Sequence, residues 1–144
     1  MATTAPSGRA GLHPLHALLL GFPVALFAVA LLADVTYLNT AEMQWSNFAA
    51  WAITGALLVG APVLAWAVLG AVVHGRGERG FARWGYPLLV ALAWAVGLVN
   101  AFQHSRDAWA SVGAAGLIMS LMSVAFVVAA GWIAYSPRRA GAAA

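Results

Sequence analysis

Four long apolar segments constrain this chain more than any other feature of its sequence. A helix needs about 20 consecutive apolar residues to cross the hydrocarbon core of a bilayer. Of the 144 residues, 63% are hydrophobic and only 8% are charged, whereas soluble domains carry about 25% charged residues. We therefore expect an integral protein of a cell membrane, surrounded by lipid, with predicted spans at residues 14–35, 48–73, 84–102 and 110–135.

The connections between these spans are short, at residues 36–47, 74–83 and 103–109. Four helices joined in this way form an up-down-up-down bundle, so the predicted fold class is all-α. We expect the membrane domain to cover residues 13–136, with disordered segments at residues 1–12 and 137–144.

The positions of the basic residues predict the orientation of the bundle. All seven are arginines, and an even number of spans places six of them on one side of the membrane. The positive-inside rule then makes both termini cytoplasmic, which means the inner membrane in a Gram-negative host. The six are Arg9, Arg76, Arg79, Arg83, Arg138 and Arg139, and Arg106 stands alone on the other side.

Several function classes have no support in the sequence. The chain has no cysteine, which excludes disulfides, thiolate metal sites and cysteine nucleophiles. It also lacks a phosphate-binding glycine loop, a G-x-S-x-G elbow and an H-E-x-x-H pair. The arginines are explained by topology, so we expect no nucleic-acid partner, and no catalytic residue is predicted.

One group of polar residues is expected on the cytoplasmic side. His13 and His16 enter the first span there, and His74 leaves the second. A b-type haem held between two helices needs one imidazole from each at similar depth. We therefore predict His16 and His74 as candidate ligands of haem iron, with His13 as a further cofactor-binding candidate. Small residues before His74 would leave room for a cofactor, but they are equally typical of close helix packing.

A second group is expected at the outer side of the membrane. Ionisable groups at this depth are costly and normally face the bundle interior, paired with a partner. One face of the third span, which carries Tyr86, Val90, Ala93 and Gly97, would direct Asn100 and His104 towards Asp34. Such a group could relay protons, bind a quinone head group or form a structural hydrogen-bond network. Its members are Asp34, Tyr37, Asn100, His104 and Arg106.

The serines of the fourth span, Ser120 and Ser123, are interpreted as helix-contact residues.

The opening segment "HPLHALLLGFPVALFAVALLADV" resembles the start of the DUF2231 family of small predicted membrane proteins. The similarity rests on His13, Pro14, His16, Phe22 and Pro23, and it continues over residues 12–135 to an Asn100…Arg106 element. It implies a four-helix membrane domain, and the occurrence of some members beside redox domains implies electron transfer. The family often has a further histidine where this chain has Gly21, so a cofactor that depended on that position would be lost or rebuilt around His74.

Three functions follow from these observations. The first is a haem b-binding electron-transfer or membrane-anchor subunit, which exchanges electrons with quinol or a redox partner protein. The second is a non-enzymatic assembly protein. The third is a small transporter subunit whose polar path contains Asp34, Asn100 and His104, which would require oligomerisation because transporters usually have more helices. In each case we expect a homo-oligomer or a subunit of a membrane complex.

Overall fold

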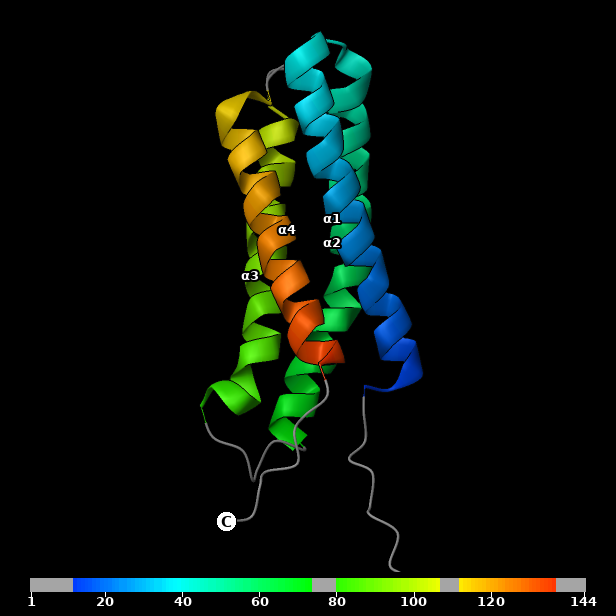
Figure 1. Ribbon diagram of the computed structural model, residues 1–144, viewed down its shortest axis with the longest axis vertical. Helices are drawn as coiled ribbons and strands as arrows, with labels where there is room; N and C mark the ends of the chain where they lie inside the picture. The colour runs from blue at the N-terminus through cyan, green and yellow to red at the C-terminus, as the bar shows by residue number, and fades with distance from the viewer. Residues whose placement is uncertain (1–11, 74–79, 107–111, 137–144) are drawn as a thin grey trace, which may run out of the picture.

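The computed structural model describes residues 12–73, 80–106 and 112–136, and these form four helices (Figure 1). All four helices are long and apolar enough to cross a membrane, and the described ranges contain no strand. The predicted all-α, four-helix membrane fold is therefore confirmed. Apart from Leu12, the terminal segments predicted to be disordered lie outside the described residues. The helices are α1 (Pro14–Thr40), α2 (Met43–Val73), α3 (Phe81–His104) and α4 (Gly113–Tyr135).

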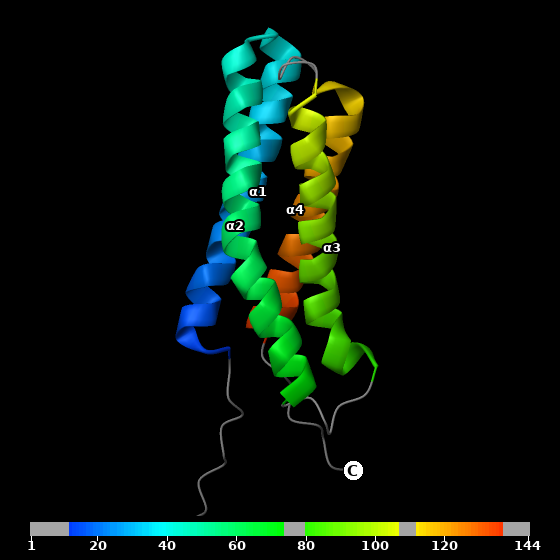
Figure 2. The ribbon, with the colours of Figure 1, turned by 180° about the vertical axis from the view of Figure 1, so that it is seen from behind.

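The helices stand at the corners of an elongated bundle and alternate in direction (Figures 1 and 2). Helix α1 packs beside α2 and α4, and α3 packs beside the same two helices, so α1 and α3 are diagonally opposite and parallel. We call the end where α1 begins and α4 finishes the His16 end, and the opposite end the Asp34 end. Which end faces the cytoplasm stays a prediction.

Three of the four helices, α1, α2 and α3, extend beyond the predicted spans, most clearly between α1 and α2. The predicted connection at residues 36–47 is almost entirely helical, and only Ala41 and Glu42 separate the two helices. Ala41 ends α1 in the left-handed conformation, with a φ of 55°. The polar side chains of this last turn donate hydrogen bonds to carbonyl oxygens four residues earlier, so they find their partners within the helix itself. These side chains are Thr36, Asn39 and Thr40.

The core of the bundle pairs small residues with a few large ones. A Cβ atom placed on Gly97 of α3 would lie 2.7 Å from the ring of Phe27 on α1, so this ring occupies the space that the glycine leaves. Small residues at such contacts let membrane helices approach closely, and the resulting van der Waals packing replaces the hydrophobic driving force that lipid cannot supply.

Pro62 interrupts the hydrogen bonding of α2 in the middle of the bundle. Proline has no N–H to donate to the preceding turn, and its ring pushes that turn open. The indole N–H of Trp94 on α3 donates to the carbonyl oxygen of Leu57 in this turn, at 3.1 Å. The carbonyl oxygen that loses its N–H donor to Pro62 is that of Leu58, and the Trp94 bond is made to the adjacent carbonyl, so a neighbouring helix supports the backbone beside the proline.

Candidate functional site

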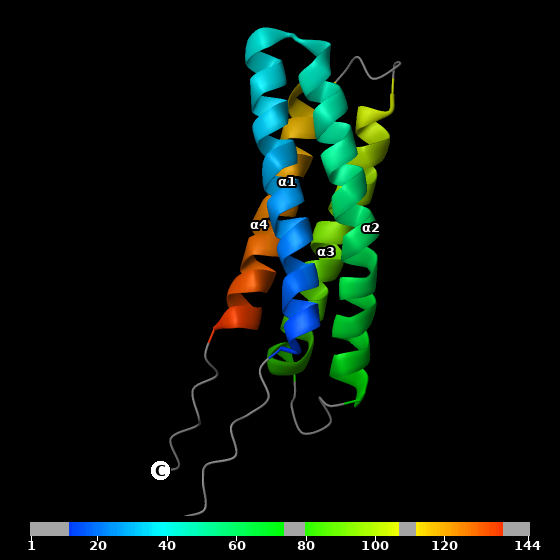
Figure 3. The same cartoon turned by 90° about the vertical axis from the view of Figure 1, so that its right-hand side faces the viewer.

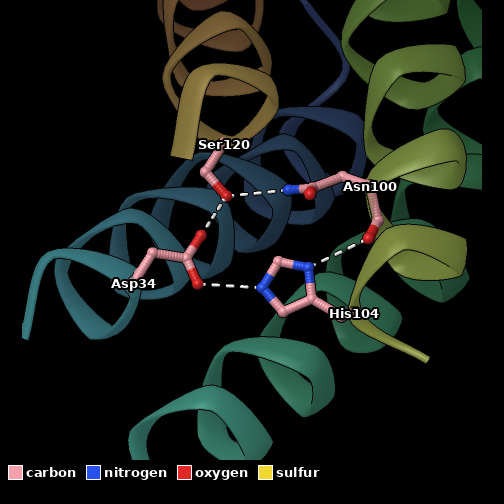
Figure 4. Close-up of polar contacts among 4 residues, drawn as sticks. All are labelled: Asp34, Asn100, His104 and Ser120. Atoms are coloured by element: carbon pink, nitrogen blue, oxygen red, sulfur yellow. Dashed lines mark hydrogen bonds and ion pairs between the residues drawn. The ribbon is translucent and has the colours of Figure 1, made fainter. Parts of the chain in front are cut away.

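Four polar side chains from three helices meet at the Asp34 end (Figure 4). Asp34 of α1 lies between His104 of α3, whose Nε2 is 2.8 Å from Oδ1, and Ser120 of α4, whose Oγ is 2.5 Å from Oδ2. Asn100 of α3 donates from Nδ2 to Ser120 Oγ at 2.7 Å. Each of the four residues is at most 1% exposed, so the whole group is shielded from lipid and water.

The hydrogen bonds of this group form a closed ring that begins and ends at Asn100. The Asn100 amide donates to Ser120, and the Ser120 hydroxyl donates to Asp34. His104 then bonds to Asp34 through Nε2 and to the backbone oxygen of Asn100 through Nδ1, at 2.9 Å. Hydrogen bonds in such a chain polarise and strengthen one another in a medium of low dielectric constant. We call this group the Asp34 ring.

The ring defines where its protons lie. The carbonyl oxygen of Asn100 can only accept, so Nδ1 of His104 carries a hydrogen. Ser120 already donates to Oδ2 of Asp34. One further proton therefore occupies the contact between Oδ1 and Nε2, bound either to the carboxyl group or to the imidazole. With this single proton, Asp34 and His104 together carry no net charge, which suits their depth in the membrane.

The register of the helices assembles the ring. Asn100 and His104 are four residues apart and so project from one face of α3. His104 is the last residue of α3, and Gly116 of α4 lies close to its ring, since a Cβ there would be 3.6 Å from Cε1. Ser105 and Arg106 follow at once and are exposed. The ring is therefore buried, with His104 at the last residue of α3 and with Asp34 and Ser120 about two helical turns from the corresponding ends of α1 and α4.

The structure brings together three of the five residues predicted for this group. Asp34, Asn100 and His104 meet, whereas exposed Arg106, just beyond the end of α3, bonds to Gln103 at 3.3 Å. Tyr37 is half-buried, one turn beyond Asp34 on α1. Ser120 was not predicted as a member of the ring, although its depth in the fourth span matches that of Asp34. Ser123, by contrast, bonds within the described part of the chain only to a carbonyl oxygen of its own helix, at Met119.

His16 is the centre of a second polar group, at the other end of the bundle. Its side chain is 2% exposed, and its Nε2 lies 2.6 Å from the hydroxyl of Tyr86 on α3. Nδ1 is buried and has no hydrogen-bond partner among the described residues. The indole of Trp66 on α2 packs against both His16 and His13, with ring centroids 5.2 and 5.4 Å away. His13 itself caps α1, since its Nδ1 accepts from the N–H of Leu15.

The predicted haem site between His16 and His74 stays untested, because His74 lies outside the described residues. Of the two predicted ligands, only His16 is described, and its Nε2 is hydrogen-bonded to Tyr86. Tyr86 would have to move before this nitrogen could bind iron. The described ranges contain no cluster of three or more histidine, aspartate or glutamate side chains that could hold a metal ion.

An apolar layer separates the two polar groups. His16 and Asp34 are about five helical turns, or about 27 Å, apart along α1. The buried positions of α1 between them are Leu20, Pro23, Phe27, Ala30 and Ala33.

Comparison with known proteins gives one match. The model of a family described as "Predicted membrane protein (DUF2231)" matches residues 12–134. Neither the curated proteins nor the solved structures give a match. The family model covers all four helices except the last residue of α4, and it includes every residue of the Asp34 ring. The chain therefore belongs to the DUF2231 family of predicted membrane proteins.

Proposed function

We propose that this protein is a proton-responsive membrane protein in which the Asp34–His104 pair binds and releases a proton at one side of the bilayer. The observation that carries the proposal is the buried contact of 2.8 Å between Oδ1 of Asp34 and Nε2 of His104, in a ring where the Ser120 hydroxyl and Nδ1 of His104 already have acceptors. An ionisable pair inside a membrane is costly to maintain and is therefore a candidate functional site.

The neutral pair is the form that the bundle tolerates best. Removal of the shared proton leaves a buried carboxylate that faces the lone pair of a neutral imidazole. Addition of a second proton leaves a buried imidazolium beside a neutral carboxyl group. Either change places an uncompensated charge in a medium of low dielectric constant, which is strongly unfavourable. The contacts among α1, α3 and α4 at the Asp34 end therefore depend on the protonation of this pair.

The geometry favours proton binding at one side over conduction across the membrane. His104 ends α3, so a small opening there would bring water to the ring. In the opposite direction, the buried positions of α1 are apolar for about five turns. The Asp34 ring thus supports the binding site that the transporter hypothesis needs. The described part of one chain has no continuous polar path from this site to the other side of the membrane. Oligomerisation and membership of a larger complex stay predictions.

The haem-based electron-transfer function is a separate proposal. Its support in the described residues is a single buried imidazole, that of His16, at the end opposite to the Asp34 ring. Because Tyr86 holds Nε2 of that imidazole, the described residues fit a hydrogen-bonded histidine better than an axial ligand.

The proposed function is tested by NMR of isotope-labelled imidazole nitrogens in protein reconstituted in lipid nanodiscs. A His104→Gln variant assigns the His104 signals. We expect both ring nitrogens of His104 to show strongly deshielded protons, and we expect these signals and a single proton release to titrate together. In Asp34→Asn, the coupled step should disappear while the chemical shifts of the His13 nitrogens at a fixed pH stay as in the wild type. A His104 signal that titrates identically in wild type and in Asp34→Asn would refute the proposal.

A further inference from the structure

Arg83 of α3 is held in place at the His16 end of the bundle. Its Nε donates to the carbonyl oxygen of Ala71, at 2.9 Å, where the last turn of α2 lies beside the first turn of α3 (Figures 2 and 3). Helix α2 ends at Val73, so this carbonyl has no N–H of its own helix to accept from. A cation at the C-terminal end of a helix also interacts favourably with the helix dipole.

The guanidinium group of Arg83 is also supported by the next residue along the chain. Its Cζ lies 5.1 Å from the ring centroid of Trp84, within the range of a cation–π contact. The carbonyl of Ala71 and the indole of Trp84 together fix the orientation of this planar group. Arg83 thus differs from an arginine that moves freely in solvent, because the direction of its remaining donors is set in advance.

This cation has unused donors and no counter-charge among the described residues. A guanidinium group has five N–H donors, and within residues 12–73, 80–106 and 112–136 only the one on Nε has an acceptor. The side-chain carboxylates in the same ranges are those of Asp34 and Glu42, and both belong to the Asp34 end. The N–H groups on Nη1 and Nη2 therefore suit an oxyanion that accepts two hydrogen bonds at once, the kind of partner that arginine binds best.

Apolar side chains continue from this cation along the outer face of α3. Trp84, Leu88 and Leu92 follow one another at intervals of four residues, so they share one side of the helix. All three are exposed, and they run from the first turn of α3 towards the middle of the bundle. A partner that matches both features has an anionic group at one end and a hydrocarbon chain at the other.

We propose that Arg83 binds the phosphodiester group of an anionic phospholipid, whose acyl chains lie against Trp84, Leu88 and Leu92. Nη1 and Nη2 donate to the two non-bridging phosphate oxygens. The indole of Trp84 lies at the membrane interface, which is the depth that tryptophan prefers.

The depth of Arg83 favours a lipid over an acidic segment of a partner protein. Helix α3 has 24 residues and is therefore about 36 Å long, whereas the hydrocarbon core of a bilayer is about 30 Å thick. The first turn of α3, which contains Arg83, thus reaches the level of the lipid phosphates. The proposal uses no residue of the Asp34 ring, and its failure would leave the proposed proton-binding function unaffected.

The experiment measures which lipids the protein retains, by native mass spectrometry in a non-ionic detergent. Delipidated protein is mixed with equal amounts of phosphatidylglycerol and phosphatidylcholine that have the same acyl chains. We expect a preference of about fivefold for phosphatidylglycerol in the first lipid retained, because the choline group compensates the charge of its own phosphate. Excess glycerol 3-phosphate, which has a phosphate but no acyl chains, should not displace the lipid.

Two arginine variants provide the matched control. Arg83→Gln removes the cation and should abolish the preference. Arg106→Gln makes the same change at the Asp34 end, where Arg106 is exposed and bonds to Gln103, and the preference should stay as in the wild type. Trp84→Leu retains the cation and an apolar side chain but removes the aromatic support of the guanidinium group, so it should reduce the preference. This third variant leaves the Arg83–Ala71 bond intact and serves if Arg83→Gln does not fold.

Three results would overturn the proposal. In the first, the wild type retains both lipids equally, which would mean that a protein carboxylate neutralises Arg83, such as that of Glu78, which lies outside the described residues. In the second, Arg83→Gln, or Trp84→Leu in its place, has the same preference as Arg106→Gln. In the third, glycerol 3-phosphate displaces the lipid, which would identify a site for free phosphate.

Discussion

Asp34 and His104 are joined across the diagonal of the bundle at a sequence separation of 70, and His16 and Tyr86 are joined at the same separation. Phe27 and Gly97, which are in contact between these pairs, are also 70 positions apart. Helices α1 and α3 are parallel, so a constant separation means that their facing sides stay in register over about five turns. Two polar contacts and one ring-to-glycine contact therefore hold the same diagonal.

The proposed proton-binding role of the Asp34–His104 pair predicts that the stability of the bundle depends on pH. Below the range where the pair holds one proton, the second proton creates a buried positive charge. Above that range, the loss of the shared proton leaves a buried negative charge. We therefore expect the thermal stability of the detergent-solubilised protein to pass through a maximum with pH and to fall on both sides.

The matched variant for this measurement is the double replacement Asp34→Asn with His104→Gln. Its amide side chains can still bond to each other and to the ring but cannot titrate. Its stability should vary much less with pH, and a profile as steep as that of the wild type would argue against the Asp34–His104 pair as the cause.

The two buried serines of α4 should differ in their contribution to stability. Ser120→Ala removes the partner of both Asp34 Oδ2 and Asn100 Nδ2, and each buried polar atom left without a partner costs about 1–3 kcal/mol. Ser123→Ala removes only a bond within α4 and should change the free energy of unfolding by less than about 0.5 kcal/mol. Chemical unfolding in mixed micelles measures the free energy of unfolding of both variants. Equal losses would show that the hydrogen bonds of the ring add no stability beyond that of side-chain packing.

Gly97→Ala should destabilise the bundle, because the new methyl group overlaps the Phe27 ring. Overpacking of this kind costs about 1–3 kcal/mol. Phe27→Leu alone should also destabilise by leaving a cavity, whereas the double variant should recover part of the loss. A double-mutant cycle measures the coupling, and strictly additive losses would contradict direct contact of the two residues.

The hydrogen bond from Trp94 should stabilise α2 near Pro62. Trp94→Phe leaves the Leu57 carbonyl oxygen without this donor and should cost about 0.5–1.5 kcal/mol. Trp132→Phe is the control, since Trp132 is 77% exposed on the outer surface of α4, and it should change stability by less than about 0.5 kcal/mol. If the two replacements have the same effect, the loss at Trp94 reflects the size of the side chain and not the hydrogen bond.

The four helices and the end of the bundle at which each polar residue lies could be predicted from the sequence. Apolar length defines a span, and the alternating direction of consecutive spans sorts the residues that flank them. The buried face of α3, which carries Val90, Ala93, Gly97, Asn100 and His104, also followed from spacing, because polar residues mark it. In the structure, His104 bonds to Asp34, and Asn100 is joined to Asp34 through Ser120.

Which polar residues bond to one another at each end of the bundle depended on tertiary structure. The depth of Ser120 in its span matched that of Asp34, but the spacing did not show that Ser120 faces the ring and that Ser123 does not. Nor did it show that His16 bonds to Tyr86 or that Arg106 stays outside the ring.

The physical reason is that lipid and the bundle interior are equally apolar. Hydrophobic periodicity therefore carries little information about how a membrane helix is rotated about its axis. The sequence by itself determined that the chain forms four membrane-spanning helices with polar groups at both ends. The rotation and register of those helices, established by contacts such as Phe27 on Gly97, decided which polar atoms meet.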